Sequence, residues 1–313
     1  MPKRNVLLSF LLMPAFFLAA CETKQQNDPT VDTSSPSGVI QKQNDKKADD
    51  DLPFRAMLTS SRFEKEIHAA AQGELRPASS AVKFRWDFSA DKSYLYDFRQ
   101  KVVSKSYGET NRDSSASLNG RLSMKSKGDG TADMGLDQMR AQMNFGQKKE
   151  PKTKPLKIPP MAMPGISEDG SLPAGSNPQA ILTRFLFPFP EEALATGATA
   201  QIPLHVPFNA GGSPLTVKGE ARVKMMGLIE RDGRTLACLE VTYDISDLDV
   251  PKELNGDYGC STRGRALIFY DVKDRALESA DMAIVMGIRA SVPNSPIQTA
   301  MDNDYHIQIV RKR

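Results

Sequence analysis

Apolar residues recur at every second position through the C-terminal third of this chain. Two such stretches flank the short turn "KDR": "RGRALIFYDV" (263–272) and "ALESADMAIVMGIRA" (276–290). Two more flank "RDGR" at 231–234. Side chains of a strand point alternately to opposite faces, so a period of two predicts strands with one buried face. This region is therefore predicted to form two long hairpins, and "DYHIQIV" (304–310) predicts a further strand.

The same period occurs earlier in shorter segments. Residues 83–88 ("KFRWDF") and 94–98 ("YLYDF") alternate aromatic with polar side chains, which predicts two strands joined by a turn at 91–92. Residues 121–136 predict a hairpin around "GDG". After Leu136 the apolar positions shift by one residue, so we expect a bulge or a short helical turn there.

Two segments carry helical signals. Residues 61–72 begin with Ser61 as N-cap and Glu64 as its capping-box partner, and Gly73 ends the segment. Residues 177–187 begin with "NP" and stop before a proline. Strands follow one another without intervening helices, which favours meanders over β-α-β units. The expected fold is mainly β (α+β): a highly curved antiparallel sheet or half-barrel of about nine or ten strands with two or three short helices.

The start of the chain has the pattern of an export signal. Lys3 and Arg4 precede an apolar run at 6–20. The run is too short to cross a hydrocarbon layer of about 30 Å, which needs about 20 residues. No later segment is apolar for long enough to cross a membrane either, so the sequence predicts a secretory signal and not a membrane-spanning helix.

The end of this run resembles the lipobox of bacterial lipoproteins. It consists of Leu18, Ala19, Ala20 and Cys21. The resemblance implies cleavage before Cys21, which becomes the new N-terminus and carries acyl chains; the alternative is an ordinary signal peptide with an incidental cysteine. Several acyl chains anchor a protein stably where one is marginal. In Gram-negative families an Asp after the cysteine retains the lipoprotein in the inner membrane, so Glu22 implies the outer membrane.

A polar stretch follows the cysteine. Residues 22–51 contain few large apolar side chains, so they cannot bury enough surface to offset their ordering entropy. The sequence therefore predicts a signal peptide (1–20), a lipidated disordered tether (21–51) and a single β-rich domain (52–313) with a Pro-rich loop at 148–164.

The charge balance excludes one class of partner. The chain has 41 basic and 38 acidic residues, and Lys3 and Arg4 lie in the leader, so the mature chain is close to neutral. Proteins that bind nucleic acid carry a strongly basic face or stripe. Nucleic acid is therefore not an expected partner.

A wider resemblance rests on "YLYDFRQ", "PEEALATGA" and "GRALIFYDVKDRALESADMAIVM". With the lipobox and the tether, these segments resemble an uncharacterised family of bacterial lipoproteins. Residues 80–312 are also loosely similar to the curved-sheet lipid-binding proteins of the LolA/LolB and vitellogenin types. The resemblance implies a half-barrel that holds lipid. It rests on pattern and not on a motif, so it assigns no functional residue.

The sequence contains no catalytic or metal-binding motif. Its histidines are His68, His205 and His306, and none has a partner at metal spacing. "GCSTRG" lacks the glycine that a nucleophile elbow has two residues after its serine. The many methionines are interpreted as core fillers, as a plastic surface facing lipid, or as a soft-metal site at Met161 and Met163. We expect a protein that is not an enzyme and has no metal and no cofactor.

Two further cysteines, Cys238 and Cys260, remain beside Cys21. A pair in an exported protein suggests a disulfide. If 235–247 and 261–272 form a simple hairpin, however, Cys238 lies opposite residue 269, and Cys260 lies about 30 Å from it at 3.3 Å per residue. A disulfide and two free thiols therefore both stay open.

Three hypotheses for the function follow. The first is a non-catalytic lipoprotein of the outer membrane, anchored by lipid, whose β domain binds an apolar ligand or lipid on the periplasmic side. The second is a structural or assembly accessory lipoprotein that grips another envelope protein through a strand edge or through 148–158. The third is a hydrolase whose residues are scattered along the chain. A large apolar cavity on the concave side favours the first hypothesis, and a filled core favours the second.

Overall fold

The structure is a computed structural model that describes residues 60–69, 73–89, 92–107, 112–144, 155–172, 179–210, 213–250, 257–291 and 298–313. The predicted signal peptide, the lipobox with Leu18, Ala19, Ala20 and Cys21, the sorting residue Glu22 and the tether lie outside these segments. Within them, no helix combines the length and the apolar character that crossing a membrane requires.

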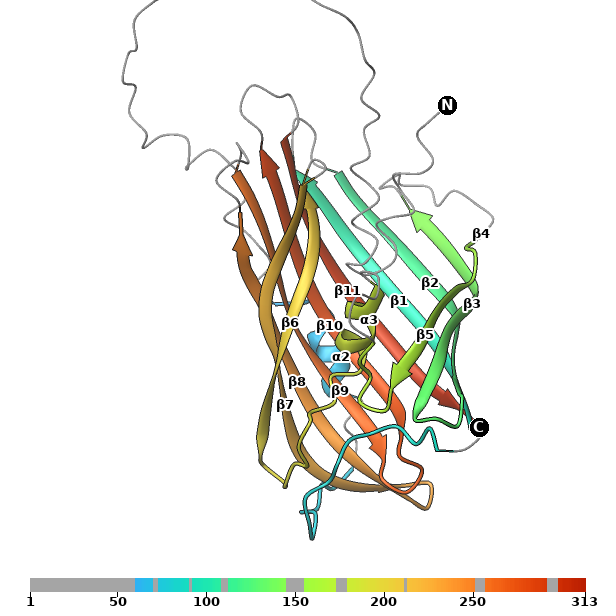
Figure 1. The fold of residues 1–313 in the computed structure, drawn as a ribbon. Coiled ribbons are helices and arrows are strands. Elements are labelled where there is room, and N and C mark those ends of the chain that lie inside the picture. The colour runs from blue at the N-terminus through green and yellow to red at the C-terminus, as the bar shows by residue number, and fades with distance from the viewer. Residues whose placement is uncertain are drawn as a thin grey trace, which may run out of the picture.

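One antiparallel sheet contains most of the described residues (Figure 1). Its 11 strands follow the order β4-β3-β2-β1-β11-β10-β9-β8-β7-β6, and β5 pairs with β3. The strands are β1 (Ser93–Tyr107), β2 (Arg112–Ser126), β3 (Thr131–Asn144), β4 (Leu156–Lys157), β5 (Met161–Ser167), β6 (Thr199–Ala210), β7 (Ser213–Arg231), β8 (Arg234–Asp249), β9 (Asp257–Asp271), β10 (Ala276–Ser291) and β11 (Gln298–Lys312). The described helices are α2 (Glu64–Ala69) and α3 (Gln179–Leu186). The predicted fold class, a mainly β protein built on a curved antiparallel sheet, is confirmed.

The sheet curves into an open trough (Figure 1). Its strand order ends at β6 on one side and at β4 on the other, and no pairing joins these two ends. α3 lies inside the trough and contacts β6, whereas α2 packs on the outside against β9 and β10. Edge strand β6 carries Pro203 and Pro207, which have no backbone N–H to donate. The described part of the Pro-rich segment, 155–164, supplies the edge strand β4 and the start of β5.

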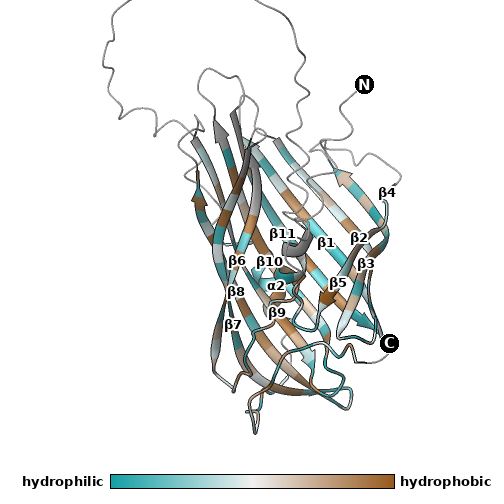
Figure 2. Ribbon diagram, viewed as in Figure 1, coloured by the Kyte–Doolittle hydropathy of each residue, from teal (hydrophilic) through white to brown (hydrophobic). Residues whose placement is uncertain are grey.

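The N-terminal and C-terminal parts of the sheet meet where β1 pairs with β11. Leu95 lies opposite Lys312 at one end of this seam, and Tyr107 lies opposite Ala300 at the other. Residues directly opposite each other share a face, so the register shows which side chains enter the trough. Hydrophilic and hydrophobic residues alternate along many of the strands (Figure 2). Most of the buried apolar ones form one continuous core on the inner face, and two smaller clusters, around Cys238 and around Phe63, lie on the outer face.

A bulge interrupts the pairing of β2 with β3, in agreement with the shift of apolar positions after Leu136. The register skips between Asn119 and Arg121, and Gln138 on the facing strand has a φ of 53°. Gly120 faces the trough, where an added Cβ would lie 2.0 Å from the sulfur of Met139. The methionine therefore occupies the space that the glycine leaves, and the bulge bends the sheet here.

The segment 83–88 corrects one expectation. It is extended, but it forms no ladder with 94–98, so the predicted strand pairing is wrong. Phe84, Trp86 and Phe88 are nevertheless all buried on the inner side. Any extended backbone alternates its side chains, so a period of two identifies an extended segment without identifying its hydrogen-bond partner.

Candidate functional site

The two ends of the trough differ. At the turn end, tight turns at 127–130, 232–233 and 272–275 join successive strands. At the loop end, strands β1, β3, β6, β8 and β10 finish. The inner side chains near these two ends belong to different chemical classes.

Aromatic rings fill the trough at the turn end. Five fully buried side chains, which we call the aromatic plug, are Phe84, Trp86, Phe88, Phe187 and Phe189. The Trp86 ring stacks on Phe88 at a centroid distance of 5.9 Å and meets Phe187 edge-on at 5.4 Å. Pairs in this range add about 0.5–1.5 kcal/mol each beyond their area burial. The plug is therefore a strongly packed part of the core.

Backbone hydrogen bonds hold the plug in place. The N–H of Trp86 donates to the carbonyl of Glu168 at 2.7 Å, and the hydroxyl of Tyr270 donates to the carbonyl of Arg85 at 2.6 Å. The Arg85 guanidinium in turn donates to the carbonyl of Pro190 at 2.7 Å. Because these bonds satisfy the backbone polar groups of the extended segment, it crosses the trough without joining the sheet.

Aliphatic side chains line the trough nearer the loop end. The set that we call the aliphatic wall is Val102, Leu204, Val206, Val217, Ile245, Met286 and Ile288, all of them buried. α3 lies against this region, where the ring of Phe185 stacks on Tyr243 at 4.5 Å. The Tyr243 hydroxyl donates to the carbonyl of Phe185 at 2.9 Å. The wall is apolar, and its side chains come from both halves of the sheet.

Two polar side chains of β11 interrupt this apolar surface. Asn303 and Tyr305 are both 0% exposed. They lie opposite Ser104 and Val102, which places them on the inner face. Ser104 donates to Oδ1 of Asn303 at 2.6 Å, but Nδ2 of Asn303 and the hydroxyl of Tyr305 have no hydrogen-bond partner in the described part of the chain. We call Asn303 and Tyr305 the polar pair.

Both members of the polar pair can donate a hydrogen bond. Burial raises the pKa of Tyr305 above its ordinary value, so its hydroxyl keeps its proton and can donate. Both unsatisfied groups are therefore hydrogen-bond donors. An unsatisfied buried donor costs about 1–3 kcal/mol, and such exceptions in a native structure call for an explanation.

The cysteines of the domain are free, and the disulfide that the sequence left open is not formed. Cys238 lies opposite Phe269, as the hairpin register predicted, whereas Cys260 lies opposite Ile288. The two thiols also face opposite sides of the sheet, Cys260 toward the trough and Cys238 toward the outside. Burial raises the pKa of each to about 12, so both stay protonated at neutral pH and neither is activated as a nucleophile.

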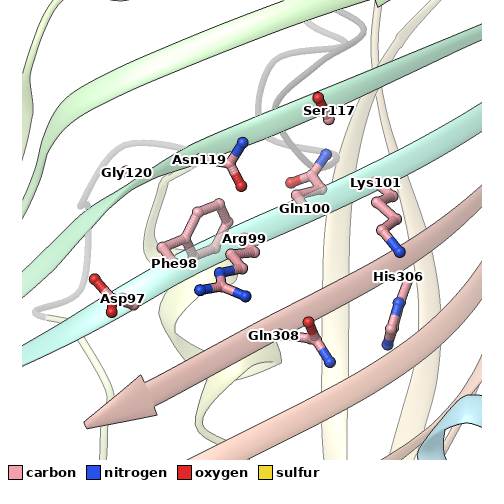
Figure 3. Close-up of a pocket in the computed structure, with 10 residues that line it drawn as sticks. All are labelled: Asp97, Phe98, Arg99, Gln100, Lys101, Ser117, Asn119, Gly120, His306 and Gln308. Atoms are coloured by element: carbon pink, nitrogen blue, oxygen red, sulfur yellow. The ribbon is translucent and has the colours of Figure 1, made fainter. Parts of the chain in front are cut away.

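A polar groove of about 590 Å³ lies on the outer face of β2, β1 and β11 (Figure 3). Arg99 lies directly opposite Asn119 on one side and Gln308 on the other. Lys101 likewise lies between Ser117 and His306. The groove is next to Gly120 and the bulge, where β2 bends.

The floor of this groove carries unpaired positive charge. Arg99 and Lys101 form no ion pair with a described carboxylate, and Asp97, the acidic residue of the lining, is held by Lys312 at 2.9 Å. Three more basic residues share this outer face on the neighbouring strands and form no ion pair with a described carboxylate: Arg121, which lies opposite Asp97 and Asp137, Arg140 and Lys157. The outer face of β1 to β4 is therefore basic, although the chain as a whole is close to neutral.

α2 attaches beside this groove. The ring of His306 is 2% exposed and stacks on Phe63 at 5.2 Å. Its nitrogens lie 2.7 Å from Asp281 and 3.2 Å from Glu66. His306 is thus enclosed by carboxylates and an aromatic ring, which makes it a contact between α2 and the sheet.

Comparisons with known proteins identify no family. No family model matches the chain, and no curated protein matches it. The chain is similar to a solved structure described as "Lipid-protein interactions in lipovitellin", with a TM-score of 0.43 and 13% identity over 72% of this chain. It spans 26% of the length of that protein.

The histidines singled out in the sequence do not come together. His205 is exposed on edge strand β6, His306 lies under α2, and the side chain of His68 is outside the described residues. In the described segments, no three His, Cys, Asp or Glu side chains gather where a metal ion could bind. Met163 is buried in the core, and the partly buried side chain of Met161 packs against that core.

Sequence reasoning missed both the polar pair and the groove. The polar pair could have been predicted from the sequence. Asn303 and Tyr305 alternate in step with the apolar residues Ile307 and Ile309, so all four side chains point to the same face of the strand. The groove had no such signal, since its residues meet only through the register of three strands.

Proposed function

We propose that this protein is a non-catalytic lipoprotein of the bacterial outer membrane, anchored by acyl chains on Cys21, whose trough binds an apolar ligand or lipid on the periplasmic side. The observation that carries the proposal is the aliphatic wall with the polar pair set into it. Sites for small molecules are typically lined by apolar side chains with a few placed polar groups.

The polar pair supplies a reason for an amphipathic ligand. Nδ2 of Asn303 and the hydroxyl of Tyr305 both donate, and both lack an acceptor in the described part of the chain. A carboxylate or ester oxygen on an acyl chain would accept these hydrogen bonds, while the chain itself packs on the aliphatic wall. Fatty acids and acylglycerol lipids combine these two features.

The two cysteines provide a test with a built-in control. Cys260 faces the trough and Cys238 faces the outside. The purified mature chain is titrated with a fluorescent fatty acid, and the rate at which methyl methanethiosulfonate modifies each thiol is measured by mass spectrometry. We expect saturable uptake, with slower modification of Cys260 and an unchanged rate at Cys238. No uptake, or equal protection of both thiols, would contradict binding in the trough.

A specific observation favours the accessory role as a second candidate. The aromatic plug fills the turn end of the trough, and a filled core leaves less room for a ligand. In this case the protein grips another envelope protein through a strand edge. A photo-crosslinker at position 205 of β6 would then trap a protein in cells, while the fatty acid titration shows no uptake.

A further inference from the structure

We propose that the groove on the outer face of β2, β1 and β11 binds a phosphate group, with Arg99 and Lys101 as its charged ligands. This site lies on the opposite face of the sheet from the trough, so it does not depend on the proposed function.

The register brings the donors together. Asn119, Arg99 and Gln308 form one row across three strands, and Ser117 and Lys101 belong to the next row. Residues directly opposite each other on neighbouring strands have Cβ atoms about 4.5–5.5 Å apart. A phosphate above these two rows is therefore within reach of a guanidinium, an ammonium, two amides and a hydroxyl. Figure 3 shows these side chains around the groove.

The charges at this site are not used elsewhere. Several basic side chains on the outer face of β7 to β9 are paired with a carboxylate. Lys218 pairs with Asp249, Arg263 with Asp244 and Arg265 with Glu240 on the neighbouring strand, and Arg222 pairs with Glu220 two positions away on β7. Arg99 and Lys101 have no such partner among the described residues. The contrast indicates that the groove presents its positive charge to a ligand.

Acidic residues lie at the end of the groove that is next to α2. Asp281 and Glu66 lie beyond His306, and both contact its ring. Gln308 donates to Asp281 at 3.3 Å, so this carboxylate is occupied as well. An anion is therefore expected over Arg99 and Lys101, on the side of the groove away from α2.

The donor set favours phosphate over other anions. Arg binds phosphate oxygens through two parallel N–H groups, and Lys adds a compact point charge. The neighbouring basic residues Arg121, Arg140 and Lys157 extend the positive surface, which suits a phosphate that belongs to a larger anionic molecule. The source of the phosphate is either a phospholipid headgroup or a soluble phosphate compound.

Two probes distinguish these sources. Inorganic phosphate represents the soluble compounds, and glycerophosphoglycerol, the deacylated headgroup of an anionic phospholipid, represents the lipid. Binding of each to the mature full chain is measured by isothermal titration calorimetry in low salt. Tighter binding of glycerophosphoglycerol assigns the site to a headgroup, and tighter binding of inorganic phosphate assigns it to a soluble compound.

A matched pair of variants tests the residues. We expect R99Q/K101Q to weaken binding of the preferred probe about tenfold or more, because both charged hydrogen bonds are lost. The control K218Q/R222Q removes the same charge from the outer face of β7 and should leave binding unchanged. Circular dichroism verifies that both variants are folded. If neither probe binds the wild-type chain, or if both double variants lose affinity equally, the proposal is wrong.

Discussion

The hydroxyl of Ser104 donates a 2.6 Å hydrogen bond to Asn303, although 199 positions separate the two residues in the sequence. The bond crosses the seam between β1 and β11, where the first and last long strands join one sheet. It satisfies the oxygen of the Asn303 amide and leaves the amide nitrogen without a partner among the described residues. The seam therefore carries both a structural contact and the donors of the candidate ligand site.

The hydroxyls of Tyr305 and Tyr243 offer a direct comparison. Both are fully buried, but only that of Tyr243 has an acceptor, the carbonyl of Phe185. We expect Tyr305→Phe to leave the free energy of unfolding unchanged or slightly higher, because no hydrogen bond is lost. Tyr243→Phe should lower it by about 1 kcal/mol. Urea denaturation of the ligand-free protein measures both, and a clear loss for Tyr305→Phe would mean that its hydroxyl has a partner.

The aromatic plug should contribute strongly to stability. Trp86 is 0% exposed and contacts several other rings, so Trp86→Ala leaves a large cavity. We expect the free energy of unfolding to fall by about 3–5 kcal/mol. Leu156→Ala is the control, because Leu156 is 40% exposed on the edge strand β4 and should change stability by less than about 0.5 kcal/mol. Equal effects of the two changes would exclude the plug as part of the core.

The hairpins were predictable from the sequence because their information is local. The turns "RDGR" and "KDR" and the period of two around them fix both the strands and their nearest partners. The bulge after Leu136 was visible for the same reason. The pairing of β1 with β11 was not predictable, since alternation shows that a segment is extended but not which distant strand it joins.

The segment 83–88 shows the same limit. Its alternation correctly indicated that Phe84, Trp86 and Phe88 share one face, but its backbone crosses the trough and bonds to Glu168 and Tyr270 in place of a strand. The rows of the outer groove were equally hidden, because they depend on registers across three strands.

Asp304 should fix α2 to the sheet. Its carboxylate is 0% exposed and accepts hydrogen bonds from the Ser61 hydroxyl and from the backbone and guanidinium of Arg62. We expect Asp304→Asn to lower the free energy of unfolding by about 1.5–3 kcal/mol, the range for hydrogen bonds to a charged group. Hydrogen exchange should become faster at the amides of α2.

The control for Asp304 is Asp113→Asn. Asp113 is exposed on the same outer face, and its side chain forms no hydrogen bond or ion pair with a described residue. We expect its substitution to change neither stability nor exchange in α2. Unchanged exchange in Asp304→Asn would show that α2 is held by its apolar contacts alone.

The buried thiols should make the protein sensitive to alkali. Burial raises the pKa of Cys238 and Cys260 to about 12, whereas an unfolded cysteine has a pKa of about 8.5. Above that value the unfolded state releases these protons first, so stability falls as pH rises toward the folded pKa. The expected slope is about 1.4 kcal/mol per pH unit for each thiol.

Urea denaturation between pH 8 and 10 measures this slope. The upper limit stays near the ordinary pKa of tyrosine, because the raised pKa of Tyr107 and other phenols would add to the effect above it. Cys260→Ala should reduce the dependence of the unfolding free energy on pH by the contribution of one thiol. This expectation holds whatever the substitution does to stability at pH 7. An identical slope in the variant would show that this thiol does not contribute.

The proposed lipid anchor and its sorting signal can be tested by substitutions at Cys21 and Glu22. If Cys21 is the lipidation site, Cys21→Ser should abolish the incorporation of labelled palmitate and leave the signal peptide attached, because a hydroxyl does not replace the thiol that accepts the lipid. Glu22→Asp should keep its acyl chains but move the protein to the inner-membrane fraction. Labelling and membrane fractionation in a Gram-negative host check both variants. Unchanged labelling of Cys21→Ser would contradict the anchor, whereas a wild-type protein in the inner membrane would contradict only the sorting role of Glu22.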